Sequence, residues 1–268
     1  MGLFDRFKKQ DCEICGKEVG MFGYKKLEDG EICKECVKKL SPWFDDRRHS
    51  TVAQIKEQLA YRAKNEEELA NFTVSKIIGE AYKMYIEEVN GVPTRFFVTD
   101  AQNYMEATPD IINFRDVLSC FTDLEAREEE MKRDDGKGNR VGYNPPRFKV
   151  HYNFYMEMAI DNNPYFQKIR FYVNTGVVTL ETVGSTGLFG GSIFSSKAVP
   201  LTSSISDTRN RQRYHEYETM CQQIEEAVAR SKMSAAPAAA GAPKFCPECG
   251  APAAGSKFCV QCGKQLQG

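Results

Sequence analysis

The chain has 268 residues and a formal net charge of −1, with 36 basic residues against 37 acidic ones. This balance excludes the overall positive charge of a protein that binds nucleic acid over its whole surface. No stretch approaches the roughly 18 consecutive apolar residues that would cross a membrane, so no transmembrane segment is expected.

Residues 1–10 are interpreted as an N-terminal tail. Leu3, Phe4 and Phe7 would share one helical face beside basic residues, which is the composition of a short membrane-surface anchor. Charged residues interrupt this stretch too early for a signal peptide, and position 6 lacks the Ser or Thr of a myristoylation signal. We therefore expect a cytoplasmic protein whose tail docks on its own surface, with peripheral membrane association as a remote alternative.

Eight of the ten cysteines form CxxC pairs, two pairs near each end of the chain. The metal-ligand candidates are Cys12, Cys15, Cys33, Cys36, Cys246, Cys249, Cys259 and Cys262. Two CxxC turns supply the four thiolates of a closed tetrahedral zinc site, and in a cytosolic protein paired cysteines favour metal over disulfides. The sequence predicts two structural zinc ions, with iron as the alternative, and the two sites would move the net charge to roughly −5.

Residues 11–48 are predicted to form a treble-clef-like zinc finger. Gly16 follows the first pair and can adopt positive φ, whereas Cys36 is followed by a plausible helix start. The segments Cys12-Glu-Ile-Cys-Gly-Lys-Glu-Val and Gly-Glu-Ile-Cys33-Lys-Glu-Cys36 resemble a bacterial domain family of unknown function with a CxxCG...CxxC zinc-finger pattern. The resemblance covers about residues 10–65, and that family has no assigned activity to transfer.

Residues 49–70 are predicted to be a connecting helix. Ser50 is the expected N-cap, and Val52, Ile55 and Leu59 would share one face. The helix is expected to join the finger to the body of the protein.

Residues 71–232 are predicted to form a β-rich domain that ends in a helix. The expected strands are 74–79, 82–89, 95–99, 117–124, 148–160, 169–174 and 177–180. Asn90-Gly91 and Asn174-Thr-Gly176 are hairpin signals. Alternation predicts that Phe148, Val150, Tyr152 and Phe154 share a face.

The final helix of this domain is expected from about Arg209 to Lys232, with a stripe of Tyr214, Tyr217, Cys221, Ile224 and Val228. Seven strands followed by one helix resemble a pleckstrin-homology-like barrel, an analogy of element order. The overall fold class is therefore α+β.

Two insertions interrupt the predicted barrel. Residues 125–147 combine mixed charge with turn formers, which predicts a solvated hairpin extension or a disordered loop. Residues 183–207 contain an apolar island that either covers the core or awaits a partner. No phosphate-binding loop is formed there, because the glycines lack a following Lys-Ser or Lys-Thr.

An Ala/Pro linker at residues 233–243 separates the β-rich domain from residues 244–268. The segments Lys244-Phe-Cys-Pro-Glu-Cys-Gly and Lys257-Phe-Cys-Val-Gln-Cys-Gly-Lys are similar to the zinc-ribbon modules appended to many prokaryotic proteins. The resemblance implies a small metal-dependent ribbon and no reaction.

No arrangement of residues predicts an enzyme or a small-molecule substrate. Cys120 and Cys221 lie in apolar patterns, and a Cys120/His151 pair depends on an unknown strand register. We expect a non-enzymatic zinc-binding scaffold that acts through protein–protein binding. The alternative is a nucleic-acid-binding protein that uses its zinc modules, since the ribbon carries lysines and phenylalanines.

Overall fold

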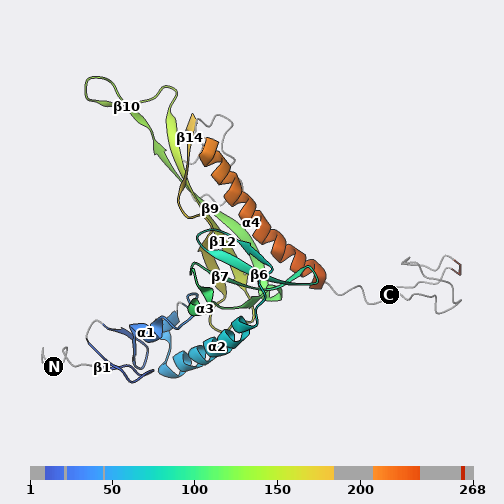
Figure 1. Ribbon diagram of the computed structural model, residues 1–268. Coiled ribbons are helices and arrows are strands. Elements are labelled where there is room, and N and C mark those ends of the chain that lie inside the picture. Colours follow the sequence, from blue (N-terminus) through green and yellow to red (C-terminus); the bar gives the residue numbers. More distant parts are fainter. Residues whose placement is uncertain (1–9, 21–22, 45, 184–207, 236–260, 263–268) are drawn as a thin grey trace.

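The computed structural model describes residues 10–20, 23–44, 46–183, 208–235, 261 and 262 (Figure 1). The predictions for the N-terminal tail, the apolar island, most of the linker and most of the ribbon lie outside these residues. The described part is a mixed α+β structure, as expected.

The N-terminal module contains two small antiparallel sheets and a short helix. Its elements are β1 (Gln10–Asp11), β2 (Glu18–Val19), β3 (Tyr24–Lys26), β4 (Glu31–Cys33) and α1 (Lys34–Val37). A 3-10 helix at Asp46–His49 leads from this module to α2.

Helix α2 (Val52–Ala70) connects this module to the body. Its N-cap is Thr51 and not Ser50 as the sequence suggested, because Thr51 and Gln54 form a reciprocal capping box. The Ser50 hydroxyl instead donates to the Asp46 carbonyl over 2.8 Å. Ile55 packs with the N-terminal module and Leu69 with the first large sheet, so α2 spans both.

The first large sheet is antiparallel with the strand order β5-β6-β7-β8. Its strands are β5 (Lys76–Ile78), β6 (Lys83–Val89), β7 (Val92–Thr99) and β8 (Ile112–Asn113). The short helix α3 (Tyr104–Ala107) lies between β7 and β8. The hairpin predicted at Asn90-Gly91 is confirmed, with φ values of 52° and 75° that suit the twist of a tight two-residue turn.

The second large sheet is built around one long strand. Its strands are β9 (Val117–Glu130), β12 (Arg147–Ile160), β13 (Lys168–Tyr172) and β14 (Val178–Val183). β12 pairs with β9 along its length, while β13 and β14 pair one after the other with its opposite edge. β12 alternates buried and half-buried residues throughout, which confirms the predicted inward face.

The second hairpin signal was wrong. β13 and β14 do not pair with each other, and the chain continues along the same edge of β12 through residues 173–177. The Asn174 side chain explains the interruption, because its Oδ1 accepts a 2.8 Å hydrogen bond from the Phe154 N–H in the place of a backbone partner. Asn174 therefore interrupts the pairing with β12 between β13 and β14, and no hairpin forms there.

Of the two alternatives for residues 125–147, the structure has the hairpin extension. β9 and β12 extend beyond the body, and β10 (Lys132–Asp134) pairs with β11 (Arg140–Gly142) to form the tip. Figure 1 shows this arm projecting away from the rest of the molecule.

Helix α4 (Thr208–Ala235) covers the space between the two sheets. Its predicted stripe is confirmed, since Tyr214, Tyr217, Cys221, Ile224 and Val228 are all buried in the main core. The helix passes from β14, where Asn210 donates to the Thr179 carbonyl, to β9, where Glu225 accepts from the Thr122 N–H. It therefore closes one core formed by both sheets.

The expected pleckstrin-homology-like barrel is not found among the described residues. The two sheets share no strand pair, because β5 to β8 pair only among themselves and β9, β13 and β14 pair only with β12. The sheets are instead joined through α4, through a shared set of buried side chains, and through backbone hydrogen bonds from residues 80–82 to Tyr172 and Val173. None of the helices described is both long enough and apolar enough to cross a membrane.

Candidate metal centre

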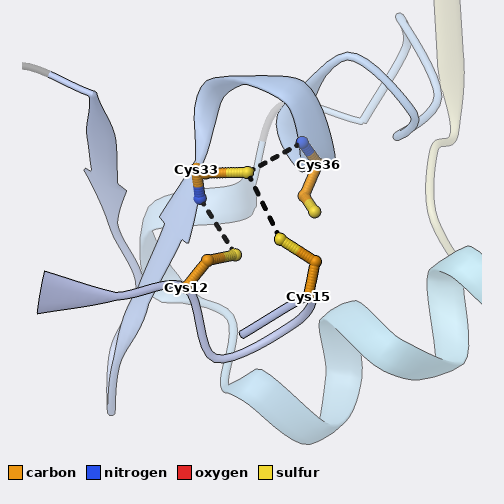
Figure 2. Close-up of side chains that lie close together, drawn as sticks. All are labelled: Cys12, Cys15, Cys33 and Cys36. Carbon is orange, nitrogen blue, oxygen red and sulfur yellow. Dashed lines mark hydrogen bonds between the residues drawn. The ribbon is translucent and has the colours of Figure 1, made fainter. Parts of the chain in front are cut away.

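Four of the predicted ligands come together at the N-terminal module (Figure 2). The Sγ atoms of Cys12, Cys15, Cys33 and Cys36 all lie within 4.8 Å of one another, and those of Cys15 and Cys33 are 3.8 Å apart. Thiolates at about 2.3 Å from a central zinc ion would be separated by about 3.8 Å. The cluster therefore has the dimensions of one tetrahedral metal site.

The first pair is held by a tight turn. Gly16 has a φ of 68°, a value that glycine adopts without strain, and its N–H donates to the Cys12 carbonyl over 2.7 Å. Burial opposes ionisation of Cys12, but the backbone N–H groups of Cys33, Cys15 and Ile14 outweigh it and lower the pKa of this thiol to about 6. The turn therefore favours the thiolate form of Cys12 at neutral pH.

The second pair lies at the start of α1. Cys33 is the N-cap of this helix, and its Sγ accepts a hydrogen bond from the Cys36 N–H over 3.3 Å. Burial and the neighbouring thiols raise the pKa of Cys36 in the metal-free cluster. A bound divalent cation would reverse this effect, because coordination stabilises the thiolate form.

Three of the four clustered cysteines are buried. Cys12, Cys33 and Cys36 are at most 4 % exposed, whereas Cys15 faces solvent. A small apolar core of Leu27, Ile32, Leu40 and Ile55 packs with the buried cysteines, and Ile55 belongs to α2. The position of the metal site is therefore coupled to the connecting helix.

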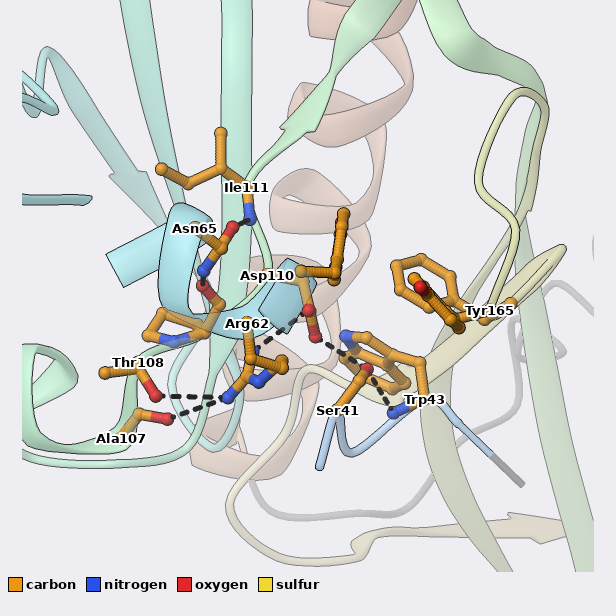
Figure 3. Close-up of polar contacts among 12 residues, drawn as sticks. Ser41, Trp43, Arg62, Asn65, Ala107, Thr108, Asp110, Ile111 and Tyr165 are labelled. Carbon is orange, nitrogen blue, oxygen red and sulfur yellow. Dashed lines mark hydrogen bonds and ion pairs between the residues drawn. The ribbon is translucent and has the colours of Figure 1, made fainter. Parts of the chain in front are cut away.

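A buried polar junction joins the N-terminal module, α2 and the segment before β8 (Figure 3). Arg62 donates from Nη1 to Asp110 Oδ1 over 2.9 Å and from Nε to the Lys39 carbonyl over 3.2 Å. The Ser41 hydroxyl donates to Asp110 Oδ2 over 2.7 Å. Burial raises the pKa of Asp110, and the Arg62 charge and these hydrogen bonds oppose that rise.

Asn65 extends the junction by one turn of α2. Its Nδ2 donates to the Pro109 carbonyl over 2.6 Å, and its Oδ1 accepts from the Ile111 N–H over 2.7 Å. Neither Arg62 nor Asn65 was predicted from the sequence to be a buried polar residue. The available signal was that these polar residues continue the spacing of the buried face that includes Ile55 and Leu69.

A cavity of about 440 Å³ lies beside this junction. Its walls come from the segment after Cys36, including Val37 and Phe44, and from the first sheet and the turn before β6, including Val98 and Tyr82. Its most deeply buried charge, Arg62, is already paired with Asp110. The cavity therefore follows the boundary between the module and the body.

The second predicted cluster cannot be assembled from the described residues. Cys246, Cys249 and Cys259 lie outside them, and Cys262 is an exposed residue in a turn. The second zinc site remains a prediction.

Cys120, a candidate nucleophile, and His151, a candidate base, are not in contact. Cys120 pairs with Met158 and His151 with Arg127 in the β9–β12 register, a separation of seven positions or roughly 23 Å along the strand. His151 instead contacts Thr179 at 3.0 Å. Burial raises the pKa of Cys120 and of Cys221 to about 12.

The other two histidines lie at the surface. His49 contacts Asp46 and His215 contacts Glu218, each within one turn of its own helix. The metal-ligand group of the described residues contains four cysteines and no histidine.

Residues 10–58 match the family model of DUF4428, a domain of unknown function. The match includes all four clustered cysteines and the beginning of α2, so the expected likeness to a family of unknown function is confirmed over this range. Neither the curated proteins nor the solved structures searched contain a match to the chain.

Proposed function

We propose that the protein is a non-enzymatic scaffold whose N-terminal module, a treble-clef-like finger, holds one structural zinc ion. The observation that carries this proposal is the spacing of the four sulfurs, which suits a single tetrahedral ion. Four thiolates fill the coordination shell of zinc and leave no open position for a reacting water. The bound zinc would cross-link the segment that carries Cys12 and Cys15 to the segment that carries Cys33 and Cys36, and it would not take part in a reaction.

The residues around the cluster support a structural role. The Cys33 and Cys36 backbone N–H groups donate to sulfur and orient two of the thiolates, those of Cys12 and Cys33. Ile55 and Arg62 then connect the module to the body through apolar packing and the buried junction. Zinc binding would therefore stabilise a rigid surface made from both parts.

A protein partner is favoured as the ligand of this scaffold, in a cytoplasmic setting. The outer face of the second sheet carries Phe121 and Tyr172, whose exposed fractions are 47 % and 42 %. Both lie on one face, since Phe121 is opposite Glu157 and Tyr172 opposite Tyr155. Aromatic residues are enriched at contact surfaces between proteins relative to the rest of the protein surface.

Metal content tests the zinc assignment. The full chain is expected to contain two zinc ions by mass spectrometry, one of them in the predicted C-terminal ribbon. Cys33→Ser should remove one ion and Cys246→Ser the other, whereas Cys120→Ser, outside the cluster, should retain both. Iron in place of zinc, or an unchanged metal content in Cys33→Ser, would overturn the proposal.

A proteolysis experiment tests the structural role. After zinc is removed with a chelator, trypsin should make new cuts within residues 10–49 while its cleavage pattern between residues 72 and 183 stays unchanged, because zinc supplies much of the folding free energy of so small a module. Equal resistance with and without zinc would show that the ion does not hold the module together.

A further inference from the structure

The tip of the β10–β11 arm is locally basic although the whole chain is slightly acidic. Residues 131–147 contain five basic residues and two acidic ones, a net charge of +3. The basic residues are Lys132, Arg133, Lys137, Arg140 and Arg147. Figure 1 shows that this part of the arm is remote from the body.

These five cations form no ion pair with the described residues, in contrast to Arg170 in the body. On the same sheet, Arg170 contacts Asp123 and Glu125 at 2.8 and 2.6 Å. The two acidic residues of the tip are engaged with the turn instead. Asp134 accepts from the Gly136 N–H, and Asp135 accepts from the N–H groups of Lys137 and Asn139.

The cations lie on both faces of the ribbon. The register places Asp134 opposite Arg140 and Arg133 opposite Val141, so Lys132 and Arg140 share one face and Arg133 lies on the other. On Arg133's face, the guanidinium groups of Arg133 and Arg147 lie 5.9 and 4.6 Å from the centre of the Tyr143 ring. These cation–π contacts hold two of the charges in place.

We propose that the β10–β11 arm binds duplex DNA through its phosphate backbone. The major groove of B-form DNA admits a two-stranded β-ribbon, and phosphates line both walls of the groove. A ribbon with cations on its two faces and in its turn complements that distribution. The partner is recognised by charge and shape, without an assigned base sequence.

One further observation favours DNA over a lipid surface. The tip has little apolar surface to insert into a bilayer, since Val141 is its one large apolar residue counted as exposed, at 36 %. Membrane-binding elements combine basic residues with a buried apolar face. Glu129 and Glu130, at the end of β9, border the basic tip and would repel the phosphates of DNA and of anionic lipid alike.

The proposed DNA-binding site lies in the β-rich body, whereas the sequence alternative placed nucleic-acid binding on the zinc modules. DNA binding by the arm does not depend on the proposed zinc site. Binding of the full zinc-loaded chain to a short fluorescent duplex is measured by anisotropy at several salt concentrations. The logarithm of the binding constant should fall with the logarithm of salt concentration with a slope of about −4.5, because each of the five cations would neutralise one phosphate and each neutralised phosphate contributes about −0.9.

The arm variant replaces Lys132, Arg133, Lys137, Arg140 and Arg147 with Gln. It should bind at least tenfold more weakly at low salt, with a slope near zero. The control replaces five exposed lysines elsewhere with Gln, namely Lys25, Lys26, Lys56, Lys64 and Lys83, and has the same net charge. It should bind within about threefold of the unmodified chain, since charges beyond a Debye length contribute little.

Three outcomes would overturn the proposal. They are no duplex binding by the unmodified chain, equal losses in the arm and control variants, and arm-dependent binding to phosphatidylglycerol vesicles without duplex binding. The melting temperature and zinc content of each variant are measured in parallel. A loss of DNA binding with an unchanged melting temperature and zinc content would show that the arm binds DNA independently of the zinc site.

Discussion

The guanidinium of Arg62 and the carboxylate of Asp110 lie 2.9 Å apart at the boundary between the N-terminal module and the body, and their side chains are 6 % and 0 % exposed. Four further hydrogen bonds stabilise the pair, one from Ser41 to Asp110 and three from Arg62 to Lys39, Ala107 and Thr108. This buried ion pair makes α2 the rigid link between the metal centre and the sheets.

Removing one member of this pair should be strongly destabilising. Arg62→Met leaves the Asp110 charge buried without its partner, and we expect a loss of about 3–5 kcal/mol in the free energy of unfolding. Chemical denaturation measures the loss.

The matched control for Arg62 is Lys38→Met, which breaks a 3.0 Å contact to Glu35 between side chains that are 71 % and 67 % exposed. It should change stability by less than about 0.5 kcal/mol. Adding Asp110→Asn to Arg62→Met should recover part of the loss, because no unpaired charge remains. A cost below about 1 kcal/mol for Arg62→Met would contradict the structural role of the pair.

Gly79 should be intolerant of a side chain. Its φ is 107°, and an added Cβ would overlap the carbonyl oxygen of Tyr82. Gly79→Ala is expected to cost more than about 3 kcal/mol, since backbone strain and steric overlap combine.

Gly91→Ala provides the comparison, because Gly91 also has a positive φ of 75° but nothing lies within 4 Å of the added Cβ. It should cost about 1 kcal/mol, the strain alone. Thermal unfolding of the two variants measures the difference, and equal costs would show that the Tyr82 carbonyl moves aside easily.

The carboxylate of Glu80 should make stability depend on pH. Two hydrogen bonds from Arg213, of 2.8 and 2.6 Å, and one of 2.7 Å from Tyr217 lower the pKa of Glu80 from 4.5 to about 2. The stabilisation is present above pH 4.5 and is lost as the pH falls toward about 2.

Glu80→Gln should therefore destabilise the protein by about 1–2 kcal/mol at neutral pH, with allowance for solvent screening, and should flatten the loss of stability on acidification. Urea denaturation at several pH values measures both effects. Glu216→Gln removes a more exposed contact of the same arginine and should have little effect. An acid transition unchanged by Glu80→Gln would refute the assignment.

Gln58 presents the opposite case, a polar side chain whose replacement should stabilise the protein. It is 0 % exposed, and neither its Oε1 nor its Nε2 has a hydrogen-bond partner in the described structure. Gln58→Leu should raise the free energy of unfolding by about 1 kcal/mol, because it removes a desolvation penalty.

Gln54→Leu serves as the control on the same helix. It breaks the capping box with Thr51 and should lower stability by about 1 kcal/mol. If Gln58→Leu also destabilises the protein in denaturant titrations, the buried amide is satisfied by ordered water and the prediction is wrong.

Features set by nearby residues were predictable. Cys12 and Cys15 lie in one cluster because a CxxC turn is short, and the burial of Phe148, Val150 and Tyr152 follows from alternation along a strand. The stripe on α4 follows from helical spacing in the same way. Each of these depends on separations of a few residues.

Features set by distant residues were not predictable. The turn signal at Asn174 was misread, because the bond that decides its role comes from Phe154, 20 positions earlier. The prediction of a barrel was wrong for a similar reason, because the pattern of apolar residues does not determine which strand edges pair.

The sequence by itself determined the N-terminal ligand set, the faces of the long strand and helix, and the charge of the arm. Only the tertiary structure decided that residues 125–147 form a ribbon, that its cations are left without carboxylate partners, and that Arg62 meets Asp110 across 48 positions of chain. The physical reason is that spacing within a helix, strand or turn follows from local geometry. Pairing between distant segments depends on how the whole core excludes water.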